Sequence, residues 1–327
     1  MLPFELAPPV KDYIWGGTRL RDEFGKKSNS DRLAESWELS CHPDGESVIS
    51  TGEFKGMTLN GFVQLHPEAV GKDFRSGDTF PVLVKLIDAK NDLSVQVHPD
   101  DEYAMRVEGG QGKTEMWYVV DCDEGASLIY GFRKNTAREE FRTAVENNTL
   151  MELMNTVPVK KGDVFFIEPG TVHAIGKGIL IAEIQQSSNI TYRVYDYGRL
   201  GADGRPRELH IAKALEVAST EPPSQPYGQR TPSAMEDVTK TPLASCRYFT
   251  ADRYDISQEM SLEPLSFFRH ILVIDGEADI TSSTGSLMHI KKGSSIFVPA
   301  GAEMCYIKGR CSVIMTAAPY YKEEKHK

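Results

Sequence analysis

The feature that most constrains the fold is an internal repeat. The segment 160–178 (KKGDVFFIEPGTVHAIGKG) aligns without gaps with 291–309 (KKGSSIFVPAGAEMCYIKG), and seven of the nineteen positions are identical. Upstream of each copy, residues 116–121 (MWYVVD) resemble 270–275 (HILVID), at a shorter spacing in the second copy. A β-rich unit that occurs twice predicts a duplicated barrel or jelly roll.

The two copies differ where chemistry would take place. His173 of the first copy aligns with Met304, and Glu115 aligns with Arg269. The second copy therefore keeps the glycines of the scaffold but lacks two potential metal ligands. This difference predicts one active barrel and one structural barrel.

The expected fold is mainly β, with two jelly-roll barrels and a few short helices. We expect the active domain, which also carries the short helices, over residues 1–240 and the structural domain over 241–327. The stretch 221–234 concentrates proline and polar residues and predicts a linker. The tail 322–327 (KEEKHK) is typical of a solvated chain end.

Hydrophobic periodicity and turn residues give the expected elements. Helices are predicted at 59–66, 136–154 and 207–219, the second with a capping box formed by Thr136 and Glu139. Strands are predicted at 34–39, 46–49, 80–87, 245–250, 267–274, 278–281, 295–299 and 312–315.

Composition excludes several classes of protein. The 327-residue chain has a net charge of −10, which argues against nucleic acid as the main partner. No signal peptide and no run of eighteen apolar residues is present, so we expect a cytoplasmic protein with no membrane partner. The five cysteines are scattered without a C-x-x-C spacing, which favours reduced thiols.

Four polar residues are placed so that they can share a metal. Gln96 and His98 lie two apart in an apolar alternation, so on a strand they point to the same side. Glu115 opens a second strand-like run, and His173 follows the turn at Gly170. A single histidine at a strand end is more often structural, but two nitrogens and two oxygens together suit Zn²⁺ or another divalent metal.

Several motifs resemble a known family. Gly162, Asp163, Gly170 and His173 resemble the second cupin motif, and QVHPDD (96–101) with GKTEMWYV (112–119) resembles type I mannose-6-phosphate isomerases of the short bacterial form. KDYIWGG, AESWELSCHPDG, FPVLVKLIDA and TYRVYDYGR extend this resemblance over the N-terminal two-thirds.

The resemblance implies that the two barrels are cupins, the catalytic one with the metal site in 1–240 and a cupin-like one without metal ligands in 241–327. It implies one zinc per chain, held by Gln96, His98, Glu115 and His173. It also implies two catalytic cations, Arg193 and Lys113. The sequence departs from the longer family members at two positions. Those members have a histidine where this chain has Gly112 and an aspartate where it has Asn189.

The expected activity is metal-dependent interconversion of mannose 6-phosphate and fructose 6-phosphate through an enediolate. The partner is then a small sugar phosphate, and we expect a monomer or weak homo-oligomer. Two alternatives stay open at this point: an iron-dependent cupin dioxygenase and a non-catalytic sugar-binding cupin.

Other residues leave their roles open. Lys85 lies in an apolar strand, and alternation sends it either into the barrel or outward to solvent. Arg199 ends a polar turn and is expected at the surface. Trp15 and Trp37 have flat faces that suit a sugar ring, but packing against the barrel is the commoner role for such residues.

Overall fold

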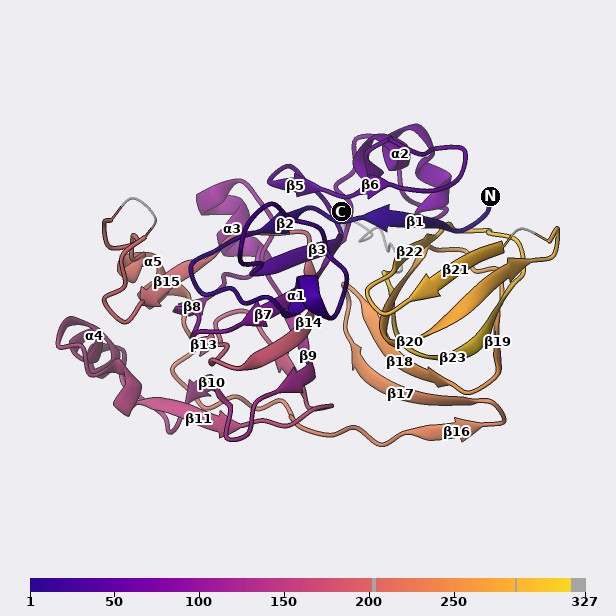
Figure 1. Ribbon diagram of the computed structural model, residues 1–327. Coiled ribbons are helices and arrows are strands. Elements are labelled where there is room, and N and C mark those ends of the chain that lie inside the picture. Colours follow the sequence, from indigo (N-terminus) through magenta and orange to yellow (C-terminus); the bar gives the residue numbers. More distant parts are fainter. Residues whose placement is uncertain (202–203, 286, 319–327) are drawn as a thin grey trace.

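The computed structural model describes residues 1–201, 204–285 and 287–318, and it forms two β-rich lobes (Figure 1). The predicted fold class, mainly β with a few short helices, is confirmed, and the two lobes are consistent with two barrels. The predicted solvated tail 322–327 lies outside the described residues.

The first lobe is built from two sheets. The six-stranded sheet has the order β12-β9-β14-β7-β3-β2 and consists of β2 (Val10–Lys11), β3 (Glu35–Leu39), β7 (Val82–Ala89), β9 (Glu115–Cys122), β12 (Val164–Ile167) and β14 (Ile179–Gln186). The five-stranded sheet has the order β11-β10-β13-β8-β15 and consists of β8 (Val95–Val97), β10 (Ser127–Phe132), β11 (Met154–Pro158), β13 (His173–Ala174) and β15 (Tyr192–Tyr195). A hairpin of β4 (Cys41–His42) and β5 (Gly45–Glu46) adds a small two-stranded sheet.

The second lobe contains a ten-stranded sheet. Its members are β1 (Phe4–Ala7), β6 (Val48–Ile49), β16 (Ser233–Met235), β17 (Val238–Ser245), β18 (Thr250–Ile256), β19 (Glu259–Leu262), β20 (Arg269–Ser282), β21 (Leu287–Lys291), β22 (Ser295–Val298) and β23 (Cys305–Ala317). The N-terminal strand β1 belongs to this sheet, where Phe4 pairs with Phe297, and the chain runs from β1 into the first lobe (Figure 1). The domain boundary at 240/241 stays a prediction. Strand β1 belongs to the first predicted domain by sequence but pairs with a strand of the second.

Strand register supports the internal repeat. Glu115 pairs with Ile167 in the first lobe, and Arg269 pairs with Val298 in the second. Val298 is the residue that the sequence alignment places over Ile167. Gly162 and Gly293, which also align, adopt positive φ angles of 91° and 92°. The same local structure is therefore built twice.

The helices are short: α1 (Arg19–Asp22), α2 (Leu59–Leu65), α3 (Asp101–Glu108), α4 (Arg138–Glu146), α5 (Ile211–Val217) and the 3₁₀ turns η1 (Pro67–Ala69) and η2 (Leu150–Glu152). The helix predicted at 136–154 is shorter, and its capping box is wrong because Ala137 is the N-cap and the Thr136 hydroxyl donates to the Lys134 carbonyl. None of the helices among the described residues is long and apolar enough to cross a membrane.

Two strand predictions in the second lobe are corrected. The segment 245–250 is a turn between β17 and β18, closed by a 2.9 Å hydrogen bond from the Cys246 N–H to the Phe249 carbonyl. The two strands predicted at 267–274 and 278–281 are one strand, β20, because Gly276 adopts a positive φ of 72° without ending it.

The largest apolar cluster joins the two lobes. In the buried strand β9, Met116 and Tyr118 point to this cluster, whereas Trp117 points into the first lobe. Phe297 and Ile314 of the second lobe complete the cluster. The six-stranded sheet is therefore buried on both faces, and its inner face is free to carry polar side chains.

Candidate metal and substrate site

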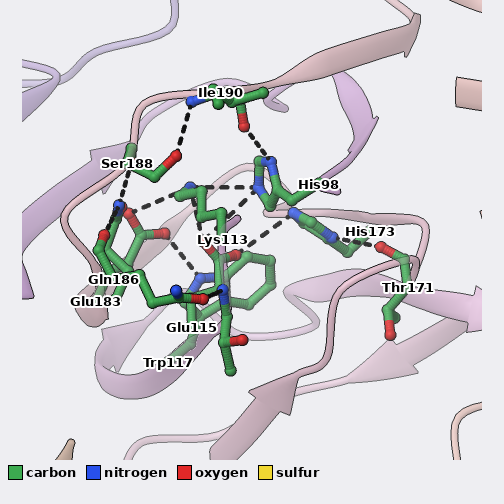
Figure 2. A network of polar contacts seen from close by, with 12 residues as sticks. His98, Lys113, Glu115, Trp117, Thr171, His173, Glu183, Gln186, Ser188 and Ile190 are labelled. Atoms are coloured by element: carbon green, nitrogen blue, oxygen red, sulfur yellow. Dashed lines mark hydrogen bonds and ion pairs between the residues drawn. The ribbon is translucent and has the colours of Figure 1, made fainter. Parts of the chain in front are cut away.

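Three of the predicted ligands converge inside the first lobe. The potential ligand atoms of His98, Glu115 and His173 all lie within 4.8 Å of one another, and all three side chains are buried. His173 Nε2 lies 3.4 Å from Glu115 Oε1, and His98 Nε2 lies 3.7 Å from Glu115 Oε2. Figure 2 shows the three side chains turned toward a common point.

The hydrogen bonds of the two histidines fix which nitrogen faces that point. His98 Nδ1 lies 2.8 Å from the Ile190 carbonyl and His173 Nδ1 lies 2.8 Å from the Thr171 carbonyl. Because a carbonyl only accepts, both Nδ1 atoms carry the proton and both Nε2 atoms present a lone pair. His173 Nε2 is buried and has no hydrogen-bond partner among the described residues.

Burial keeps both rings neutral. It lowers the pKa of His98 well below its usual value and that of His173 to about 4. A neutral imidazole with a free Nε2 lone pair is the form that binds a metal. The donor set therefore fits a divalent cation.

Gln96 lies beside this cluster. It occupies β8, where it pairs with His173 of β13 on one side and with Arg193 of β15 on the other. Its side chain lines a cleft next to the cluster, together with Lys113 and Arg193. The strand register thus brings the predicted amide ligand and the predicted arginine next to the histidine.

Lys113 approaches the ligand cluster from the loop before β9. Its ammonium lies 2.6 Å from Glu115 Oε2 and 3.2 Å from His98 Nε2, and the side chain is buried (Figure 2). The backbone explains the glycine that precedes it. A Cβ on Gly112 would lie 2.4 Å from the Asp100 carbonyl carbon, so this backbone has no room for the histidine of longer family members.

Glu183 is a further residue of the site that was not predicted from the sequence. This buried carboxylate of β14 accepts from Trp117 Nε1 at 2.9 Å and lies 3.2 Å from Lys85 Nζ. Glu183 and Lys85 are paired residues of neighbouring strands, and each is the charged residue in an apolar run. Two opposite charges in buried strands were the signal, and they settle the open orientation of Lys85, which points into the barrel.

The pKa values of the Glu115 and Glu183 carboxylates are shifted in opposite directions. Burial and the charge of Glu183 raise the pKa of Glu115. For Glu183, burial is outweighed by the ammonium groups of Lys113 and Lys85, and the pKa is lowered to about 2. Glu183 is therefore an anion that holds two lysines at the site.

A cleft of about 300 Å³ opens onto these residues. Its walls include four cations, namely Lys85, Lys113, Arg193 and Arg207, and two carboxylates, Glu35 and Glu183, so that cations are in excess. In a chain with a net charge of −10, this local reversal concentrates anionic ligands at one place.

Arg193 is held by neutral groups. Its Nη1 donates to the Glu208 carbonyl at 2.8 Å and its Nε to Ser94 Oγ at 3.3 Å. It forms no ion pair within 1–201, 204–285 and 287–318, whereas Arg207 donates from Nε to Asp196 at 2.7 Å. The charge of Arg193 is therefore available to an anionic ligand.

The structure also places the two tryptophans and Arg199, whose roles the sequence left open. Trp15 lines the cleft together with Tyr13, whereas Trp37 is fully buried and packs beneath the Lys85 ammonium at 5.1 Å. Arg199 was expected at the surface, but its side chain is only 22% exposed because it pairs with Asp196 and donates to the Asp92 carbonyl.

A buried set of two histidines and a carboxylate inside a β-rich lobe, beside a cleft with an excess of cations, is a candidate metal site of the kind found in cupins. Residues 3–125 match the type I phosphomannose isomerase catalytic domain, and residues 239–318 match the mannose-6-phosphate isomerase cupin domain. The chain belongs to the type I phosphomannose isomerase family.

Individual relatives agree with this assignment. The chain is 42% identical to mannose-6-phosphate isomerase ManA of Bacillus subtilis, over 96% of this chain and 98% of the relative. It is 38% identical to the mannose-6-phosphate isomerase of Streptococcus mutans, over 95% and 97%. A crystal structure of the mannose 6-phosphate isomerase from Bacillus subtilis superposes with a TM-score of 0.90 at 38% identity, over 97% of this chain and 99% of that one.

Proposed function

We propose that this isomerase interconverts mannose 6-phosphate and fructose 6-phosphate in the cleft of the first lobe. The observation that carries the proposal is a 300 Å³ cleft with four cations in its walls, one of which, Lys113, also contacts the buried set of His98, Glu115 and His173. Such a cleft suits a sugar whose reacting oxygens become negative and whose far end is a phosphate.

His98, Glu115 and His173 would hold the metal, with Gln96 as the fourth ligand. Zinc is the proposed ion, because two nitrogens and two oxygens match its usual ligands. When bound, the metal supplies a Lewis acid that polarises the substrate carbonyl.

The chain's own cations act on the developing charge. The reaction moves a proton between C1 and C2 through an enediolate, and the difficulty is the weak acidity of the C–H beside the carbonyl. Lys113 lies at the ligand cluster, where its ammonium can donate to a substrate hydroxyl or enediolate oxygen. Arg193 lines the cleft with its charge uncompensated, and its planar fork can bind two oxygens at once.

Glu183 and Lys85 support this arrangement. Glu183 stays ionised because Lys113 and Lys85 outweigh its burial, so it fixes both ammonium groups at the base of the cleft. The ion pair is fully buried, and removal of either partner leaves the other charge unpaired in a dry environment.

The proposal is tested by metal analysis of the purified protein together with a coupled isomerase assay before and after chelation. We expect about one zinc per chain, loss of fructose 6-phosphate formation after chelation, and recovery when zinc is restored. Full activity of the metal-free protein would contradict the metal role. Tight binding of mannose 6-phosphate with no product would favour a non-catalytic sugar-binding protein instead.

An oxygenase is the second candidate, because two histidines and one carboxylate are also the ligand set of iron-dependent oxygenases. Oxygen uptake by the iron-loaded protein, measured beside the isomerase assay, separates the two activities. We expect none. The cytoplasmic location and the state of monomer or weak homo-oligomer are also proposals, and size-exclusion chromatography with light scattering tests the second.

A further inference from the structure

The second aspartate of the QVHPDD motif, Asp101, has no part in the proposed chemistry, yet it makes four hydrogen bonds. It opens helix α3, three residues after the ligand His98. Its Oδ1 accepts from the Gly112 N–H and from Gln186 Nε2, both at 2.9 Å. Its Oδ2 accepts from Arg247 Nη2 at 2.6 Å and from the Tyr248 hydroxyl at 2.5 Å.

The Oδ1 contacts hold the loop that carries Lys113. Three consecutive N–H groups of this loop are bound: Gly112 to Asp101, Lys113 to the Pro99 carbonyl at 3.0 Å, and Thr114 to Gln186 Oε1 at 2.8 Å. Gln186 is buried and is itself bound by Asp101, so the aspartate fixes the loop directly and through this amide. Figure 2 shows Gln186 beside Lys113.

The Oδ2 contacts come from the other lobe. Arg247 and Tyr248 lie in the turn between β17 and β18, and the guanidinium carbon of Arg247 stacks 4.6 Å from the centre of the Tyr248 ring. The lobe that lacks metal ligands therefore reaches the loop of the reacting lysine through one carboxylate.

We propose that Asp101 is a positioning residue that transmits support from the second lobe to Lys113, so that its ammonium stays at the metal ligands. The inference rests on the role proposed for Lys113. The backbone has no room for a side chain at Gly112, and the Asp101 clamp closes directly on that glycine.

Two substitutions separate the halves of the clamp. Asp101→Ala removes all four contacts. Asp101→Asn keeps an oxygen for Gly112 and Gln186 and changes only the side that faces Arg247 and Tyr248. For Asp101→Ala we expect kcat to fall by about 10- to 100-fold, as for other groups that orient a reacting residue, with zinc content and KM nearly unchanged. Asp101→Asn keeps the loop contacts but loses the support from the second lobe, so we expect a smaller fall in kcat, of about 3- to 10-fold. An unchanged kcat in Asp101→Asn would overturn the role given to the second lobe.

The control is Glu23→Gln, which removes the charge from another contact between the lobes, the 3.1 Å ion pair with Lys292. The contacts of Glu23 among the described residues are with Arg19 and Lys292 and not with the Lys113 loop. We expect it to leave kcat unchanged. Melting temperatures check that each variant is folded. Tyr248→Phe is a second variant of the same contact, because it keeps the ring but removes the hydrogen bond from the Tyr248 hydroxyl to Asp101 Oδ2.

The outcomes are distinct. Wild-type kcat in Asp101→Ala would overturn the inference, and so would a loss of rate that follows a loss of zinc. Asp101→Asn as slow as Asp101→Ala would overturn the role given to the Oδ1 contacts. If the wild-type protein itself formed no fructose 6-phosphate, the proposed function would fail rather than this inference.

Discussion

The interiors of the two lobes share a scaffold and differ in chemistry. The first encloses two histidines, two carboxylates and two lysines, all buried. The second encloses an apolar cluster that includes Ile271, Val273, Ile296 and Ile307. Strand register is the same at the aligned positions, so the shared framework alone does not bring potential metal ligands together.

In the second lobe, other side chains stand at the positions of the potential metal ligands. Arg269, at the position of Glu115, donates from Nη2 to the Glu263 carbonyl at 2.5 Å, and Met304 stands where His173 would be. A duplicated framework can therefore keep its glycines and strand pairs while one copy fills its centre with apolar side chains. The other copy keeps a polar centre at the cost of several buried charges.

The largest effect is expected at the histidine that distinguishes the two lobes. His173→Ala should remove bound metal and activity together and leave a folded protein. We expect a fall in kcat of about 1,000-fold or more, because a catalytic metal supplies several kcal/mol of transition-state stabilisation. Metal analysis, the isomerase assay and circular dichroism measure the three properties. The exposed His289 of the second lobe is the matched control, and His289→Ala should keep both metal and rate.

Arg193 and Arg269 test the same contrast with two arginines. Arg193→Ala should keep its zinc but lose about 100- to 1,000-fold in kcat, the usual effect of removing one group that stabilises developing negative charge. Arg269→Leu in the second lobe should leave kcat and KM unchanged. Equal losses in the two variants would mean that both act through the fold and would contradict the catalytic role of Arg193.

Glu183→Gln sharpens the comparison inside the first lobe. The substitution keeps the size of the side chain but leaves Lys85 and Lys113 without their shared anion, so both ammonium groups are expected to shift. We expect kcat to fall by about 10- to 100-fold, since small displacements of reacting groups have effects of this size. Steady-state kinetics at constant zinc content measures it. An unchanged kcat would restrict Glu183 to a role in stability.

His270, the neighbour of Arg269, gives a prediction for stability rather than rate. It is buried between the lobes, and its Nε2 lies 2.8 Å from Ser295 Oγ. Burial, with a smaller contribution from Lys26, lowers its pKa to about 3 from the usual 6.5. Between these values the unfolded chain binds a proton that the folded chain does not, so stability falls as the pH drops from about 6.5 to about 3.

His270→Leu removes this titration and should flatten the acid limb of a plot of unfolding free energy against pH. Urea unfolding at several pH values measures the change, with activity at pH 7 as the control. An unaltered acid limb would show that other groups govern acid unfolding.

The sequence was sufficient for the repeat, the fold class and the convergence of His98, Glu115 and His173. These follow from strand periodicity and glycine turns, which are local properties. Glu183 was missed because a charge in an apolar run acquires meaning only when its partner strand is known, and β7 and β14 are nearly a hundred residues apart. Helix α3 was not predicted although Asp100 and Gly109 are typical cap residues, because its only buried side chain is Ala104 and its eight residues show no apolar face.

The strand β1 has a consequence for how the protein is made. Of its two neighbours in the sheet, β6 follows within the first 50 residues, whereas Phe297 of β22 comes 293 residues after Phe4, so one edge of β1 stays unpaired until β22 is synthesised. The first lobe can form its own two sheets before the second lobe is complete. A nascent chain without β22 therefore leaves one edge of β1 open, and an open strand edge is a segment for chaperones to cover during translation.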